Sequence, residues 1–165
     1  MKWINRNEGE KSPFSKMVVF DYDDTLYESV GTFESDHDLN KFIKDNSFWN
    51  NLFTKALPLA TSVNEFYKDG ETLVVIQTAR AERWWFPLLL FIKGIKYHYV
   101  IQRPRANYSH SANLKKSQMV DFLMRNPRYK NCFKVFVDDY KPNRDQLETV
   151  GFSVYNANYL SLIHI

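Results

Sequence analysis

Short apolar runs alternate with amphipathic stretches along most of this chain. Five runs rich in β-branched and aromatic residues have the length of buried strands: residues 17–20, 73–76, 97–101, 133–137 and 152–155. Between them, apolar positions recur at helical spacing in residues 57–69, 81–93, 114–125 and 143–150. Strands that alternate with helices are typical of a mainly parallel sheet covered on both faces. We therefore predict an α/β fold, a Rossmann-like three-layer sandwich around a five-stranded sheet.

The length of 165 residues fits one compact domain. We expect an N-terminal arm over residues 1–15 and a single domain over residues 16–165. Within that domain, about residues 27–56 are too long for a plain strand-to-helix loop and too short for a second domain. This stretch is predicted to form a small insertion over the carboxyl end of the first strand. The alternative is a surface loop with one helical turn.

Composition excludes some classes of protein. A net charge of +3 is too small to argue for nucleic-acid binding by itself, and the single cysteine excludes an internal disulfide. No apolar run approaches the roughly 20 residues needed to cross a bilayer. Residues 1–16 also lack the apolar segment of a signal peptide. We therefore expect a soluble cytoplasmic protein without membrane attachment, and the oligomeric state stays open.

The first apolar run leads directly into acidic residues. Residues 17–20 are followed by Asp21, Asp23 and Thr25. In open α/β sheets, ligands bind at the carboxyl ends of the strands. Two carboxylates two residues apart suit a hard cation such as Mg²⁺, and aspartate is an established nucleophile towards phosphoryl groups. The alternative is an acidic, solvated turn that caps the next segment.

Other strand ends add residues of matching chemistry. Thr78 follows the second strand, Asp138 and Asp139 follow the fourth, and Lys115, with Lys116 as a close competitor, opens the helix before the fourth. Right-handed crossovers bring these strand ends to one edge of the sheet. Phosphoryl transfer needs a nucleophile, a cation, fixed phosphate donors and an acid for the leaving oxygen. Each residue taken singly is more often an ordinary turn, cap or solvated residue, so the prediction depends on their combination.

The order of these residues over about residues 17–155 resembles the haloacid dehalogenase (HAD) superfamily of phosphohydrolases. The family's first motif, Asp-x-Asp-x-Thr after an apolar strand, stands here as Asp21-Tyr22-Asp23-Asp24-Thr25. Its threonine, its lysine at a helix start and its final pair of acids match Thr78, Lys115 and Asp138-Asp139. The resemblance implies a Mg²⁺-dependent phosphatase of the small-cap type, which hydrolyses phosphate monoesters through an aspartyl-phosphate.

The resemblance also implies a role for each residue. Asp21 would attack phosphorus, and Asp23 would act as general acid and then as base. The Mg²⁺ ligands would be Asp21, the backbone carbonyl of Asp23, Asp138 and its alternative Asp139. The phosphoryl oxygens would be held by Thr78, Lys115 and Arg80. Lys115 is preferred to Lys116 because Met119 and Phe122 then fall on the packed face beneath it.

The substrate class is less firmly indicated. Thr78-Ala79-Arg80 resembles the turn in HAD phosphatases that act on nucleic-acid ends, such as polynucleotide kinase-phosphatases. Arg103 and Arg105, which follow the third strand, suit phosphate groups, and Lys116 is a further substrate contact if Lys115 is the family lysine. Exposed aromatic side chains can stack on bases; the candidates are Trp84, Trp85 and Tyr108. Solvated arginines and core tryptophans are the alternatives.

Three function classes therefore remain. The first is a phosphatase that acts on nucleotides or nucleic-acid ends. The second is a phosphatase of the same fold for another small phosphate ester or a phosphoprotein. The third is a catalytically silent binding or regulatory domain, which the intact pair Asp21 and Asp23 disfavours.

Overall fold

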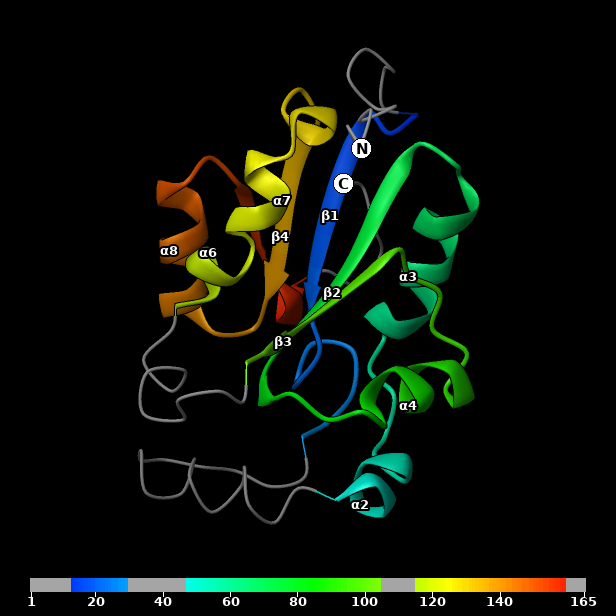
Figure 1. Cartoon of the computed structure of the whole chain (residues 1–165). Helices are drawn as coiled ribbons and strands as arrows, with labels where there is room; N and C mark the ends of the chain where they lie inside the picture. The colour runs from blue at the N-terminus through cyan, green and yellow to red at the C-terminus, as the bar shows by residue number, and fades with distance from the viewer. Residues whose placement is uncertain (1–12, 30–46, 105–114, 160–165) are drawn as a thin grey trace, which may run out of the picture.

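A five-stranded, all-parallel sheet forms the centre of the molecule (Figure 1). The structure is a computed structural model that describes residues 13–29, 47–104 and 115–159. The strand order is β3-β2-β1-β4-β5, so the first strand of the chain lies in the middle of the sheet. This architecture confirms the predicted α/β, Rossmann-like fold.

The element bounds follow the apolar runs closely. The strands are β1 (Lys16–Asp21), β2 (Thr72–Ala81), β3 (Tyr99–Arg103), β4 (Phe133–Asp138) and β5 (Ser153–Asn156). The helices are α2 (Phe48–Leu52), α3 (Leu59–Lys68), α4 (Phe86–Ile92), α6 (Lys116–Met119), α7 (Asp121–Arg125) and α8 (Lys141–Thr149), with short 3₁₀ helices η1 (Pro127–Tyr129) and η2 (Ala157–Tyr159).

Strand β1 is buried on both faces, which explains its continuous apolar sequence. Its successive side chains alternate between two cores. Val18 and Phe20 pack on the side of α3 and α4, whereas Met17 and Val19 pack on the side of α6, α7 and α8. Figure 1 shows these two helical layers on opposite faces of the sheet. The central strand thereby delivers Asp21, its last residue, to the carboxyl edge.

Strand β2 is longer than the sequence indicates. It continues through Ala81 rather than ending near residue 76, with a shift in its register against β3 between Gln77 and Ala81. Just beyond the strand, the Glu82 amide still donates to the Arg103 carbonyl over 2.7 Å. The helix predicted from residue 81 therefore begins only at Phe86.

The predicted insertion over residues 27–56 is described only at its two ends. Residues 30–46 lie outside the described ranges, as does most of the predicted arm over residues 1–15. The Glu28 amide donates to the Lys55 carbonyl over 2.9 Å, and Tyr27 pairs with Ala56. This pairing holds the start and the end of the stretch together beside the carboxyl edge.

Helix α4 is apolar on nearly all sides. Phe86, Leu89 and Leu90 are buried in the core, whereas Leu88 and Phe91 are exposed. Across the described ranges, no helix combines the length and the apolar character that a membrane crossing would require.

The contrast between neighbouring leucines on α4 gives a test of the core. Leu89→Ala removes a side chain with no solvent exposure and leaves a cavity, so it should lower the free energy of unfolding by about 3 kcal/mol. Leu88→Ala makes the same chemical change at a side chain that is 43% exposed, and should cost about 1 kcal/mol or less. Urea unfolding of both variants measures the difference, and equal losses would contradict the placement of α4.

Candidate active site at the carboxyl edge of the sheet

A tight turn at the end of β1 positions the first acidic residues of the site. The Tyr22 carbonyl accepts the Leu26 amide over 3.0 Å, and Asp24 has a positive φ of 56°. Aspartate tolerates this left-handed conformation better than most residues. The Thr25 hydroxyl donates back to Asp21 Oδ2 over 3.3 Å. The turn therefore holds the Asp21 carboxylate at the edge of the sheet, where it is almost fully buried.

A buried lysine lies between two of the carboxylates. Lys116 Nζ donates to Asp21 Oδ1 and, over 2.8 Å, to Asp138 Oδ2. The lysine is fixed in turn by Gln77, whose Nε2 donates to the Lys116 carbonyl over 3.1 Å. Burial lowers the pKa of Lys116, but the two carboxylates outweigh it and raise that pKa above its ordinary value. The ammonium thus stays charged in the interior.

Lys116, and not Lys115, is the lysine that contacts these carboxylates. The structure places Lys116 against the carboxylates, and Lys115 is an exposed residue that precedes α6. The buried face of this segment contains Lys116, Met119 and Leu123. Phe122, which the sequence pattern predicts at a core position, is 53% exposed, so the buried face of this segment differs from the predicted face by one residue.

Asp138, the last residue of β4, and Asp139 after it are held by the start of α8. Asp138 is fully buried, and its Oδ1 accepts the Tyr140 amide over 2.8 Å. Its Oδ2 accepts Asn143 Nδ2 over 3.0 Å in addition to Lys116. Arg144 Nη1 donates to the carbonyl oxygens of Asp138 and Asp139 over 2.9 and 2.8 Å. Both the side chain of Asp138 and the backbone of the pair are therefore fixed.

Three carboxylates at this edge have the arrangement of a metal site. Ligand oxygens of Asp21, Asp138 and Asp139 lie within 4.8 Å of one another. Burial, reinforced by Asp138, raises the pKa of Asp21 well above its usual range and that of Asp139 to about 6. Such crowding of acids is relieved by a cation, and an all-oxygen donor set suits Mg²⁺. The residues present fit a hard divalent ion.

The remaining predicted residues converge on Asp23. Thr78 Oγ1 donates to Asp23 Oδ2 over 3.2 Å, and Arg80 Nε donates to the same oxygen over 2.9 Å. Arg80 Nη2 forms an ion pair with Asp23 Oδ1. The guanidinium also contacts Asn51 Oδ1 through Nη1 and lies 5.4 Å from the centre of the Tyr22 ring. Arg80, which was expected on a phosphoryl group, is thus buried and engaged with Asp23 and Asn51.

Sequence reasoning missed Asn51, Asn143 and Arg144. Asn51 follows Phe48 by three residues and precedes Leu52, so it lies at an inward position of a short amphipathic stretch. A polar residue at such a position signals a buried hydrogen-bond partner, although the sequence does not say which one.

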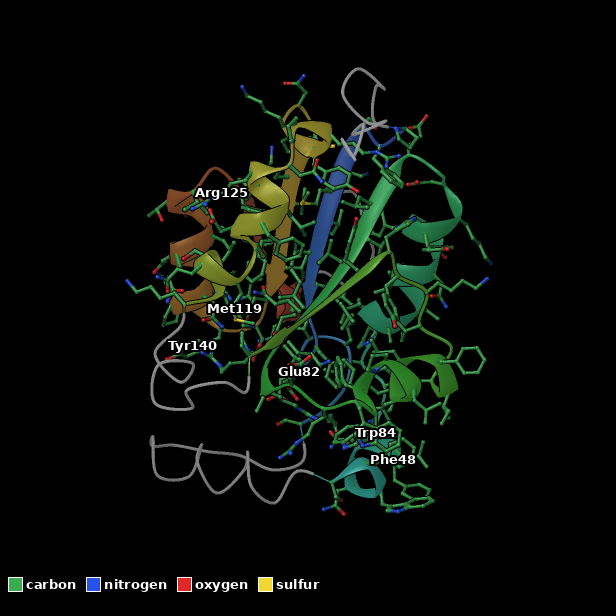
Figure 2. The ribbon with its side chains drawn as sticks, viewed as in Figure 1. Phe48, Glu82, Trp84, Met119, Arg125 and Tyr140 are labelled. Atoms are coloured by element: carbon green, nitrogen blue, oxygen red, sulfur yellow. The ribbon has the colours of Figure 1, made fainter. Side chains whose placement is uncertain are left out.

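The predicted substrate contacts are placed only in part. Arg103 Nε donates to the Ala79 carbonyl over 2.8 Å, while Arg105 and Tyr108 lie outside the described ranges. Trp84 is 82% exposed, and Trp85 packs edge-on against Phe48 of α2. Figure 2 shows Trp84 and Phe48 at the same end of the molecule, where α4 and α2 meet.

No protein-family model matches the chain, and no curated protein matches its sequence. Among solved structures, it is similar to a chain of the Pnkp1/Rnl/Hen1 RNA repair complex, with a TM-score of 0.60 and 14% identity over 89% of this chain and 44% of that one. A chain of a second structure of the Pnkp1/Rnl/Hen1 complex gives 0.56 and 16%, over 94% and 50%. The chain thus spans about half the length of these two.

The HAD domain of the effector protein Lem4 from Legionella pneumophila is also similar. Its TM-score is 0.51 at 16% identity, over 87% of this chain and 86% of that domain. At these identities the likeness concerns the fold. The fold of this chain is therefore HAD-like, as the resemblance of its sequence motifs predicts.

The buried lysine gives the test of this site. Lys116→Met removes the charge between Asp21 and Asp138 and leaves both carboxylates buried, so it should lower the free energy of unfolding by about 3 kcal/mol or more. Lys115→Met, the same change at the exposed neighbour, should stay within about 0.5 kcal/mol of wild type. Both are measured by urea unfolding without divalent metal. Equal stabilities would contradict the buried ion network.

Proposed function

We propose that this protein is a Mg²⁺-dependent phosphatase that hydrolyses phosphate monoesters through an aspartyl-phosphate on Asp21. The observation that carries the proposal is the position of Asp21, which ends the central strand beside a buried lysine and two further acids. A nucleophile, a cation site and a separately held acid are the parts that phosphoryl transfer to a carboxylate requires. The HAD-like fold of the solved structures supports the same reaction class.

The proposed reaction has two steps. In the first, Asp23 starts in its protonated form; Asp21 attacks phosphorus, the ester P–O bond breaks, and Asp23 gives that proton to the leaving oxygen. In the second, Asp23 takes a proton from the water that attacks phosphorus, the bond to Asp21 breaks, and inorganic phosphate leaves. The enzyme returns to its starting state after each cycle.

Chain residues would hold both the metal and the phosphoryl group. Bound Mg²⁺ would offset the repulsion between the anionic substrate and the carboxylates, and its protein ligands would be Asp21, the backbone carbonyl of Asp23, Asp138 and Asp139. Lys116, in place of Lys115, would hold a phosphoryl oxygen, whereas the Thr78 hydroxyl, whose single proton goes to Asp23 Oδ2, would orient that acid. Among the described residues, Lys116 Nζ donates to Asp21 and Asp138, which leaves one of its three N–H groups for a phosphoryl oxygen.

For the substrate, we propose nucleotides or nucleic-acid ends. Two of the similar solved structures are of the Pnkp1/Rnl/Hen1 complex, and one of them is described as an RNA repair complex. This similarity supports the nucleic-acid class of substrate. The exposed ring of Trp84 supports it too, because aromatic rings stack on unpaired bases. Arg103 is the last residue of β3, at the same edge, and suits a phosphate, and Arg105 stays a prediction. A cytoplasmic location belongs to this proposal as well.

The experiment is phosphate release from 4-nitrophenyl phosphate, a nucleotide panel, a 3′-phosphorylated oligonucleotide, a sugar phosphate and a phosphopeptide, with Mg²⁺ and with a chelator. We expect release only with Mg²⁺, fastest on the oligonucleotide or a nucleotide. Asp21→Asn removes the nucleophile and should lower the rate by at least about 1,000-fold.

Asp24→Asn is the matched control. It makes the same change in the same turn, where asparagine also tolerates the positive φ, and should keep a rate close to wild type. Equal losses in the two variants, or full activity in chelator, would contradict the proposed mechanism. Preference for a sugar phosphate or a phosphopeptide would move the protein to the second function class. Tight Mg²⁺ binding without release from any ester would indicate a silent binding domain.

A further inference from the structure

Asn51 of helix α2 is a fully buried polar side chain. Such a side chain lowers stability unless its donors and acceptors are satisfied, so its position in a five-residue helix needs a reason. Its side-chain Nδ2 donates to the Ser47 carbonyl over 2.7 Å, and its backbone carbonyl accepts a hydrogen bond from the Thr54 hydroxyl over 2.9 Å. These bonds fix both the backbone and the amide, so that Oδ1 is directed at Arg80.

The Arg80 guanidinium links Asn51 to Asp23. Nη1 contacts Asn51, whereas Nε and Nη2 form a two-pronged pair with the Asp23 carboxylate. The Tyr22 ring lies against the same guanidinium, which is only 4% exposed. A planar guanidinium held at one end by an amide and along its face by a ring has little freedom to rotate. The orientation of Asp23 therefore depends on Asn51.

The pair with Arg80 also distinguishes the two oxygens of Asp23. Oδ2 accepts from both Thr78 Oγ1 and Arg80 Nε, whereas Oδ1 accepts from Arg80 Nη2. A carboxylate offers about four lone-pair positions, two on each oxygen. The three donors from the described residues thus leave about one position, and it lies on Oδ1.

We infer that Asn51 is a positioning residue for proton transfer, and that it acts through Arg80 to present Oδ1 of Asp23 to the leaving group. This inference rests on the proposed phosphatase function. As the ester P–O bond breaks, the proton moves from Oδ1 to the leaving oxygen, and the attacking water later returns a proton to the same atom. The segment around α2 thereby contributes to the chemistry of the site.

Leaving-group dependence separates this role from general support of the fold. An alkyl phosphate expels a poor leaving group that needs a proton, whereas 4-nitrophenyl phosphate expels a stable phenolate that needs little help. Asn51→Ala should lower kcat by about 100-fold for glycerol 2-phosphate and by less than about fivefold for 4-nitrophenyl phosphate. KM for both esters should change little, because Lys116 and the carboxylates of the cation site remain.

The chain offers a matched control and a second variant. Asn50→Ala makes the same change at an exposed position of the same helix and should leave both rates unchanged. Arg80→Lys keeps the positive charge but loses the two parallel hydrogen bonds to Asp23. It should also lower kcat much more for glycerol 2-phosphate than for 4-nitrophenyl phosphate. Urea unfolding confirms that each variant is folded, and Arg80→Lys carries the test if Asn51→Ala does not fold.

The outcomes are distinguishable. An equal loss on both esters in an active enzyme, or no loss on glycerol 2-phosphate, would overturn the positioning role and leave the proposed function intact. A wild-type protein that releases phosphate from neither ester, nor from the nucleotide panel or the 3′-phosphorylated oligonucleotide, would overturn the proposed function, and the positioning role with it.

Discussion

The buried ammonium of Lys116 between Asp21 and Asp138 is the constraint on which the site depends. Charges taken out of water cost several kcal/mol each unless they are closely paired, so these three groups must be held in register. They come from β1, from the start of α6 and from the end of β4. The parallel pairing of β1 with β4, with the start of α6 at their carboxyl ends, brings them together. The strand order of the sheet therefore determines whether these three charged groups can pair.

Asp21 divides the site into two halves with different tasks. On one side, Lys116, Asp138 and Asp139 form a charged cluster suited to a divalent cation and a phosphoryl group. On the other side, Asp23 is held by Arg80, which α2 fixes in turn. Because Asp21 and Asp23 belong to one tight turn, the candidate nucleophile and the candidate acid are close in space and yet are oriented by separate groups of residues.

The features of the fold and the site that depend on local sequence patterns could be predicted from the sequence. A strand buried on both faces must be apolar throughout, so β1 and the acids at its end were readable, and so were the acids after β4. The sequence could not decide between Lys115 and Lys116. Phe122 has the apolar side chain typical of a core residue but is exposed, so it moves the predicted buried face of the helix by one residue. Asn51 was missed because its partner, Arg80, is distant in sequence and belongs to a strand extension that arises only from pairing with β3.

The central claim is that Asp21 becomes phosphorylated during turnover, and trapping that species tests it most directly. Asp23→Asn removes the base of the second step but leaves the nucleophile, so brief incubation with Mg²⁺ and 4-nitrophenyl phosphate should build up the phosphoenzyme. Mass spectrometry of a rapid acid digest should then find a phosphoryl group on the peptide that contains Asp21, and none on it when Asp21→Asn is added to the same chain. Phosphate release by an active enzyme without that adduct, or an adduct on another residue, would contradict the account.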